Sequence, residues 1–127
     1  MDKLIVKALE VREHAVVHQT GYKVGAALET IDGKVYVGAN VESPSAIIHV
    51  CAERTAIFSA LSAGERKFKR IAVVAERDQP IPPCGFCRQT LLEFAPEIEV
   101  IMANLEGESK TVKLSELVTD PYLFQKN

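Results

Sequence analysis

The sequence predicts an α/β fold, namely a three-layer α/β/α sandwich around a mixed five-stranded sheet whose last two strands form an antiparallel hairpin. The first observation is the order of hydrophobic patterns along the chain, which runs helix, two strands, helix, strand, helix, two strands. The second is the connection at 104–109, which is too short for a crossover helix. Since 127 residues suit one domain with a single core, we expect 1–127 to be that domain.

The N-terminal half is expected to hold a helix, a hairpin and a second helix. Apolar residues recur at helical spacing over 3–18, with Asp2 as the candidate N-cap. Alternating apolar residues flank an Asp-Gly turn signal within 22–41, which indicates a β-hairpin. A loop is expected over 43–50, followed by a helix over 51–63 that ends at the next glycine.

The C-terminal half is expected to hold one buried strand, a helix and the final hairpin. The continuous apolar run at 71–75 is typical of a central strand. A Pro-rich loop leads into a helix over 85–94. Strands follow at 98–103 and 110–114, and a short helical turn is expected over 114–118.

Composition and charge exclude several classes of partner. Apolar residues make up 47% of the chain, charged residues 25%, and the net charge is -2, so there is no basic surplus for nucleic acid. The basic cluster at 66–70 is interpreted as a solvated connection that enters a strand. No apolar run is long enough to span a bilayer, and the N-terminus lacks the apolar core of a signal peptide. We therefore expect a cytoplasmic protein without membrane partners.

The cysteines form a pattern that indicates a metal site. Their odd number argues against a secreted disulfide framework. Cys51 opens one expected helix, and Cys84 and Cys87 lie three residues apart at the start of another. A helix N-terminus stabilises a thiolate, and three protein ligands with an open fourth position are typical of catalytic zinc. The predicted cofactor is therefore Zn²⁺.

Glu53 follows the first cysteine by two residues and is the candidate catalytic residue. A glutamate in this place can face the metal without binding it, and can move protons between water and substrate. Taken alone, Glu53 would be read as an acidic residue that suits the start of a helix.

The combination of these residues matches the signature of zinc nucleobase deaminases in its three-cysteine form. The chain resembles the small cytidine deaminases from about Gly25 to Leu117. The segments that carry the resemblance are Val24-Gly25-Ala26-Ala27-Leu28, Asn40-Val41-Glu42, Cys51-Ala52-Glu53-Arg54-Thr55-Ala56 and Pro83-Cys84-Gly85-Phe86-Cys87-Arg88-Gln89.

The resemblance implies hydrolytic deamination of cytidine or deoxycytidine to uridine or deoxyuridine. Zinc would be bound by Cys51, Cys84 and Cys87, and hydroxide on the zinc would attack carbon 4 of the base. Glu53 would protonate ring nitrogen 3, accept the proton of the water and pass it to the leaving ammonia.

Further roles follow from the resemblance. The N–H of Ala52 would meet the base carbonyl, and Asn40 and Glu42 would hydrogen-bond the ribose 3′-hydroxyl. Arg54 would hydrogen-bond the cysteine sulfurs and tune the metal. Tyr22 stands where the family usually has phenylalanine, and it could stack on the base.

Two departures from the family concern the sugar side of the site. Ala46 stands where the family usually has a tyrosine that reaches the sugar in a neighbouring subunit, and His49 stands where a small residue is usual. The resemblance implies a homotetramer or a dimer. The sequence does not rank cytidine against deoxycytidine.

Three other readings stay open at this point. The substrate could be a modified nucleoside or one similar to blasticidin S. His49 could join Cys51, Cys84 and Cys87 in a closed structural zinc site without catalysis. A redox Cys-x-x-Cys protein would use two of the cysteines and leave Glu53 and the Asn-x-Glu motif unexplained.

Overall fold

The computed structural model describes residues 1–76 and 85–118. Its elements in chain order are α1 (Lys3–Arg12), β1 (Val16–Val17), β2 (Val24–Thr30), β3 (Val35–Ala39), β4 (Val41–Glu42), β5 (His49–Val50), α2 (Ala52–Ser62), β6 (Phe68–Ala75), α3 (Gly85–Phe94), β7 (Glu99–Ala103), β8 (Ser109–Lys113) and the 3₁₀ helix η1 (Leu114–Glu116). Within these ranges no helix is long and apolar enough to cross a membrane.

The main sheet confirms the predicted fold class. Among the described residues, five strands pair in the order β3-β2-β6-β7-β8. The pair β6–β7 is parallel and the other neighbours are antiparallel, so the sheet is mixed. The predicted final hairpin is the pair β7–β8, and the predicted Asp-Gly turn joins β2 to β3, with Gly33 at φ 88°.

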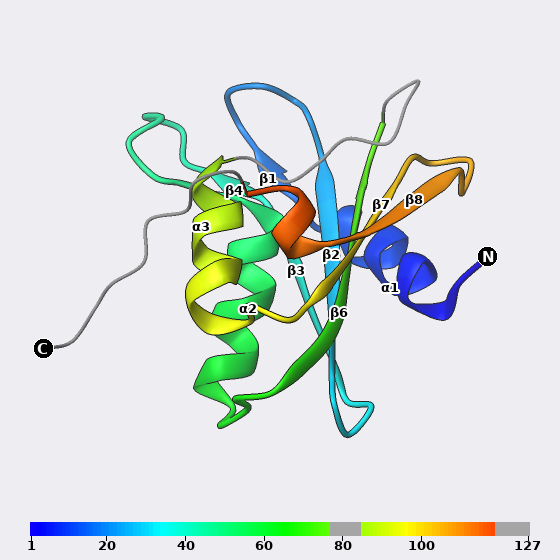
Figure 1. Cartoon of the computed structure of the whole chain (residues 1–127). Helices are drawn as coiled ribbons and strands as arrows, with labels where there is room; N and C mark the ends of the chain where they lie inside the picture. The colour runs from blue at the N-terminus through cyan, green and yellow to red at the C-terminus, as the bar shows by residue number, and fades with distance from the viewer. Residues whose placement is uncertain (77–84, 119–127) are drawn as a thin grey trace, which may run out of the picture.

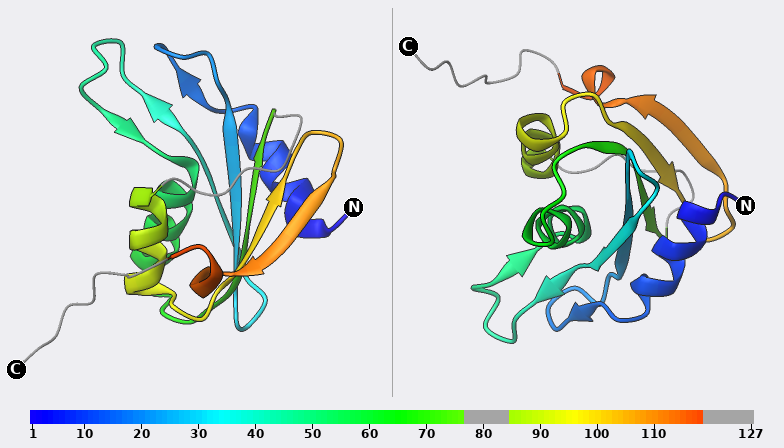
Figure 2. Two further views of the ribbon diagram at one scale, coloured as in Figure 1. Left: turned by 45° about the horizontal axis from the view of Figure 1, so that its top comes forward. Right: turned by 90° about the horizontal axis from the view of Figure 1, so that it is seen from below.

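The helices cover both faces of this sheet, as Figures 1 and 2 show. Helix α1 packs on one face, while α2 and α3 lie on the other. Each interface buries apolar side chains, the main source of favourable folding free energy. The α1 side includes Leu4, Ile5, Ala27, Val74 and Ile101. The α2–α3 side includes Leu28, Ile57, Ile71, Leu91 and Val100.

Helix α1 begins as predicted but ends earlier. The Asp2 carboxylate accepts a hydrogen bond of 2.8 Å from the Leu4 N–H, which confirms the N-cap. The helix ends at Arg12, so the prediction of a helix to residue 18 was wrong. Its expected continuation instead includes β1, which pairs in parallel with β4. Valine is well suited to strands, and here the tertiary pairing overrides the helical spacing.

A small second sheet was not predicted. In the described part of the chain, β1, β4 and β5 form it, and its strands are two residues long. Glu42 on β4 is the direct cross-strand partner of His49 on β5, so the expected loop over 43–50 becomes a hairpin that projects beyond the main sheet. Strands of two residues are too short to produce a recognisable periodic pattern in the sequence.

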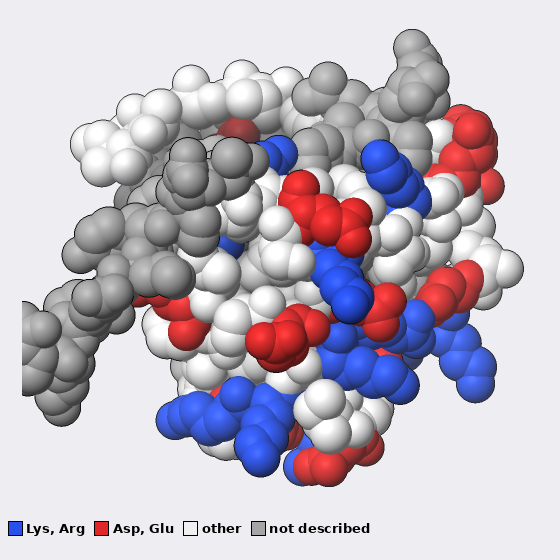
Figure 3. Space-filling model, viewed as in Figure 1, with Lys and Arg blue, Asp and Glu red and all other residues white. Residues whose placement is uncertain are grey.

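The basic cluster at 66–70 is only in part a connection. Strand β6 begins at Phe68, so Lys69 and Arg70 lie within the strand rather than before it. Arg70 forms ion pairs with Asp2 and Glu29, at 2.6 and 2.7 Å. On the face of the molecule in Figure 3, acidic and basic side chains lie interspersed.

Candidate functional site

The site is built on the first turn of α2. Cys51 is the N-cap residue, with an extended backbone at φ -72° and ψ 154°, and its side chain makes no capping hydrogen bond. The first N–H groups of a helix have no partner within the helix, so they favour negative charge nearby. Ala52, whose N–H belongs to this group, is completely buried. The start of α2 therefore brings a thiol and the first N–H groups of a helix together.

Glu53 is buried in the same turn. The residue is 5% exposed, and this burial raises the pKa of its carboxyl to about 7. The Cys51 thiolate also raises this pKa, while the residue's own N–H, a hydrogen bond with the Cys87 thiol and the charge of Arg54 lower it. A buried carboxyl with such surroundings is suited to proton transfer.

The second thiol comes from α3, which lies beside α2 (Figure 1). Cys87 is completely buried, and its hydrogen bond to the Glu53 carboxyl joins the two helices at the site. The structure thus brings together Cys51, Glu53 and Cys87. The third predicted ligand, Cys84, lies outside the described residues.

Arg54 lies against the thiols of Cys51 and Cys87. Its Nη2 is 3.8 Å from the Cys51 Sγ and 3.2 Å from the His49 carbonyl oxygen. Burial would lower the pKa of the guanidinium, but hydrogen bonds and charge from Cys51 and then Cys87 outweigh it and raise that pKa. A cation in this position balances negative charge on the sulfurs.

The donors present fit a zinc ion. Cys51 and Cys87 supply soft thiolate ligands at the site, and Arg54 supplies a cation against excess thiolate charge. No group of three or more metal-binding side chains is found within 1–76 and 85–118, and Cys84 lies outside these ranges. Zinc would be held by these two cysteines with Cys84.

Asn40 is buried, 5% exposed, and its amide forms hydrogen bonds with the backbone at the start of β2 and just before it. Its Oδ1 accepts from the Val24 N–H at 2.9 Å, and its Nδ2 donates to the Tyr22 carbonyl at 2.8 Å. Asn40 therefore fixes the half-buried Tyr22 segment in place.

Glu42 is 4% exposed and is also engaged by the protein itself. Its Oε1 accepts from the N–H groups of Gln19 and Thr20, and its Oε2 accepts from the Thr20 hydroxyl. The Thr20 backbone N–H is the main cause that lowers the pKa of Glu42, so the group is a carboxylate near neutral pH. His49 Nε2 lies 3.8 Å from Oε2.

A cavity of about 310 Å³ borders Glu42. Its other lining residues are Gln19, Thr20, Ala46, Ile48 and His49. Ala46 has a positive φ of 66°, a conformation that is uncommon for a residue other than glycine. Both departures from the family pattern, Ala46 and His49, thus line the same cavity as Glu42.

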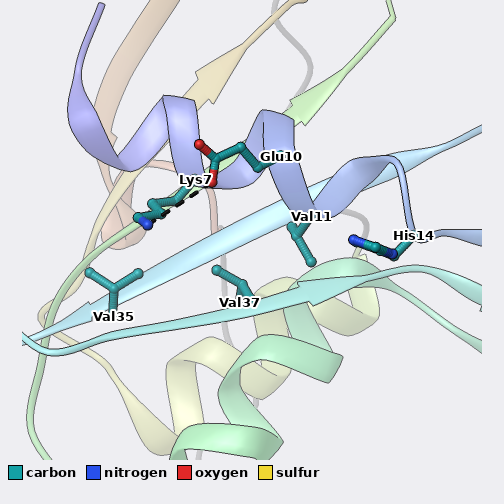
Figure 4. Close-up of a pocket in the computed structure, with 6 residues that line it drawn as sticks. All are labelled: Lys7, Glu10, Val11, His14, Val35 and Val37. Atoms are coloured by element: carbon teal, nitrogen blue, oxygen red, sulfur yellow. Dashed lines mark ion pairs between the residues drawn. The ribbon is translucent and has the colours of Figure 1, made fainter.

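A second cavity lies elsewhere and does not belong to the site. It measures about 400 Å³ and lies between α1 and β3, as Figure 4 shows. Its lining combines Val11, Val35 and Val37 with a Lys7–Glu10 ion pair of 4.0 Å and with His14. None of the predicted site residues lines it.

Gln19 and Thr20 contact Glu42 but were not predicted. Both belong to the connection between β1 and β2, which the sequence placed at a helix end. A Gln-Thr pair in such a segment carries no signal of its own. Thr20 and Glu42 are far apart in the sequence, and they come into contact only because β1 pairs with β4.

A buried carboxyl beside helix-start thiols, inside an α/β/α sandwich, defines the class of deaminase-type zinc domains. The family model described as "Cytidine and deoxycytidylate deaminase zinc-binding region" matches residues 1–103. The chain belongs to the cytidine and deoxycytidylate deaminase family.

Individual relatives agree with this family. The chain is 46% identical to a cytidine deaminase of Halalkalibacterium halodurans over 116 residues, which are 91% of this chain and 88% of that protein. It is 41% identical to a cytidine deaminase of Sporosarcina psychrophila over 127 residues, with 99% and 92% covered. A crystal structure of cytidine deaminase from Burkholderia pseudomallei matches with a TM-score of 0.91 at 46% identity, and covers 96% of this chain and 100% of that chain.

Proposed function

We propose that this protein is an enzyme that hydrolyses cytidine or deoxycytidine to uridine or deoxyuridine and ammonia. The observation that supports this most directly is the buried Glu53 beside Cys51 and Cys87 at the meeting point of α2 and α3. The family and the named activity of the relatives support the same reaction.

Zinc, held by Cys51, Cys84 and Cys87, would supply the acidity that makes water a nucleophile near neutral pH. Glu53 protonates ring nitrogen 3 of the base, which makes carbon 4 more electrophilic. It takes up the proton that the attacking water gives up and passes this proton to the amino group, which leaves as ammonia. As the bond between carbon 4 and nitrogen breaks, the second proton of the water, on the oxygen now bound to carbon 4, passes to Glu53. The carbonyl of the product forms, and the Glu53 carboxyl is protonated again as at the start.

The remaining site residues would position the nucleoside. The N–H of Ala52, in the first turn of α2, would donate to the base carbonyl. Asn40 and Glu42 would bind the 3′-hydroxyl of the sugar, and Tyr22 would stack on the base. Arg54 would hold the cysteine thiolates in place, because its positive charge offsets the repulsion between their negative charges.

Two observations favour this reading, the first over a closed structural zinc site and the second over a polynucleotide substrate. The His49 ring lies 3.8 Å from the Glu42 carboxylate and is half exposed, so its nearest charged partner is a carboxylate on β4. A closed structural site would instead need this ring on the metal. The interspersed charges in Figure 3 and the net charge of -2 suit a small nucleoside better than a polynucleotide.

We further propose that the protein assembles as a homotetramer, with a dimer as the alternative. The hairpin between β4 and β5 supports this, because it carries Ile47 at 86% exposure beside the cavity that Glu42 borders. A neighbouring subunit could cover such an exposed apolar side chain.

The test is a turnover assay with purified, zinc-loaded protein. Conversion of cytidine and of deoxycytidine is followed by ultraviolet absorbance, for the wild type and for Glu53→Gln. We expect Glu53→Gln to keep zinc and fold and to lose at least about 100-fold in kcat, the usual contribution of a general acid–base group.

Glu10→Gln is the matched control, since Glu10 is an exposed carboxylate on α1 far from the thiols. It should keep full turnover. Wild-type protein that carries one zinc per chain and converts neither nucleoside would overturn the proposal, and would point to a modified nucleoside or to the closed zinc site.

A further inference from the structure

The hydroxyl of Thr20 lies at a junction of hydrogen bonds. Its Oγ1 donates to Glu42 Oε2 at 2.8 Å and accepts from the Tyr22 N–H at 3.0 Å. The Thr20 N–H donates to the other oxygen of the same carboxylate, Glu42 Oε1, at 3.0 Å. One threonine therefore holds both oxygens of Glu42 and the backbone of Tyr22.

The acceptor positions of Glu42 show why this matters for a ligand. A carboxylate offers about four acceptor positions, two on each oxygen. Among the described residues, Gln19 and Thr20 N–H groups take those of Oε1, at 3.1 and 3.0 Å. The Thr20 hydroxyl takes one on Oε2. The position left for a ligand hydroxyl is on Oε2, the oxygen that His49 Nε2 faces at 3.8 Å and whose direction the Thr20 side chain sets.

The same junction reaches the other residues expected to bind the nucleoside. The Tyr22 N–H is held by the Thr20 hydroxyl, and the Tyr22 carbonyl is held by Asn40 Nδ2 at 2.8 Å. Asn40 Oδ1 in turn accepts from the Val24 N–H at 2.9 Å. Glu42, Tyr22 and Asn40 are thus joined into one chain of hydrogen bonds, and the Thr20 hydroxyl is the link between the first two.

Apolar packing does not explain why a threonine stands at position 20. Thr20 is exposed on the connection between β1 and β2, so its methyl group buries little apolar surface. Both partners of its hydroxyl are residues, or backbone groups of residues, in the expected nucleoside-binding set. The hydrogen bonds of the Thr20 hydroxyl therefore both lead to residues of the expected site.

We propose that Thr20 is a positioning residue for nucleoside binding, which orients Glu42 Oε2 toward the sugar 3′-hydroxyl and fixes Tyr22 relative to Glu42. The proposal rests on the proposed function. It adds a residue that acts through Glu42 and Tyr22 and does not itself touch the reacting atoms.

The experiment compares Thr20→Val, which keeps the side-chain shape and removes the hydroxyl, with Thr20→Ser, which keeps the hydroxyl. Steady-state kinetics are measured with cytidine and with 3′-deoxycytidine, which lacks the hydroxyl in question. We expect Thr20→Val to raise the KM for cytidine about tenfold, the effect of one hydrogen bond to a charged group, with kcat changed less than threefold. Thr20→Ser should restore KM to within about threefold of the wild type.

The two substrates separate positioning from general damage. With 3′-deoxycytidine the increase of KM in Thr20→Val should be smaller than with cytidine, because the oriented oxygen of Glu42 then has no partner and only the contact with Tyr22 is lost. Thr30→Val is the matched control. Thr30 accepts a hydrogen bond from the Lys34 N–H at the far end of β2, so its loss should lower stability and leave KM unchanged.

Each result is decisive. An unchanged KM in Thr20→Val, an equal increase for both substrates, or failure of Thr20→Ser to restore KM would overturn the role of Thr20 while the wild type still turns over cytidine. Absence of turnover in the zinc-loaded wild type would overturn the proposed function, and the role of Thr20 with it.

Discussion

Arg54 is a cation in the first turn of a helix, where the helix dipole disfavours positive charge. Its 3.8 Å contact with the Cys51 sulfur shows what compensates for this cost, since a thiolate lies where the side chain ends. The second contact, to the His49 carbonyl, ties the guanidinium to β5. This contact supports the proposed role of Arg54, which is to orient the predicted ligand Cys51 and to balance its charge.

Removal of this cation should weaken metal binding. We expect Arg54→Ala to lower zinc affinity by about tenfold, as substitutions of groups that support metal ligands usually do. The measurement is competition for zinc with a chelator of known affinity. Arg66→Ala is the control, because Arg66 contacts the carbonyls of Leu61 and Glu65 beyond the other end of α2. Equal zinc affinity in Arg54→Ala and the wild type would show that Arg54 is a solvated side chain on the surface of the helix and does not support the metal site.

At the scale of elements, the position of α2 depends on Gly38 in β3. A Cβ at this position would overlap the Ala56 amide nitrogen and lie 2.7 Å from the Ala52 carbonyl oxygen. The helix backbone therefore rests directly on the strand, with no room for a side chain. This close contact sets the height of the turn that carries Cys51 and Glu53.

Gly38→Ala should push α2 away from the sheet. We expect a loss of about 1–3 kcal/mol in the free energy of unfolding, the usual cost of overpacking, measured by urea denaturation. We also expect kcat for cytidine to fall, because Glu53 moves with the helix.

Gly25→Ala is the matched control, since a Cβ there would overlap the Ala8 carbonyl of α1 on the opposite face of the sheet. It should destabilise the protein and leave the kcat of the folded fraction unchanged. If both variants lost kcat equally, the effect would come from the sheet as a whole rather than from α2.

The elements differ in how far a sequence can predict them. Helix α2 and the β2–β3 hairpin have strong local signals, a run of apolar residues at helical spacing and an Asp-Gly turn, and both were confirmed. The end of α1 was wrong because the pairing of β1 with β4 joins residues 25 positions apart, Val16 with Val41. Local periodicity carries no information on such contacts.

The site divides in the same way. Cys51 and Glu53 share one helical turn, so their proximity could be predicted from spacing, and Cys87 could be added because cysteines at two helix starts indicate a metal site. The contacts of Thr20 with Glu42 required the small sheet, which has two-residue strands and no pattern. These contacts became visible only once the tertiary structure was known.

At the scale of the whole molecule, one charged network joins the N-terminus to the sheet. Arg70 on β6 forms ion pairs with Asp2 before α1, at 2.6 Å, and with Glu29 on β2, at 2.7 Å. Asp2 also caps α1 through the Leu4 N–H. The network thus fastens the helix that covers one face of the sheet to two neighbouring strands of that sheet.

The pH dependence of stability should report on this network. The Leu4 N–H, followed by Arg70, lowers the pKa of Asp2 from its ordinary value of 3.8. A carboxyl whose pKa is lower in the folded state adds stability above its unfolded pKa, and this stability is lost as the pH falls through the folded pKa. Asp2→Asn keeps the capping oxygen and removes the charge.

We expect Asp2→Asn to lower the free energy of unfolding by about 0.5 kcal/mol at pH 7, since the pair is partly exposed and screened. The difference from the wild type should stay constant from pH 7 to about pH 5 and shrink as the pH falls below 3.8. Urea denaturation of both proteins across this range measures it. Asp2→Ala, which also removes the cap, should cost about 1 kcal/mol more at every pH. A difference between Asp2→Asn and the wild type that did not change with pH would show that the charge of Asp2 adds nothing, and that α1 is held by its cap and its apolar face alone.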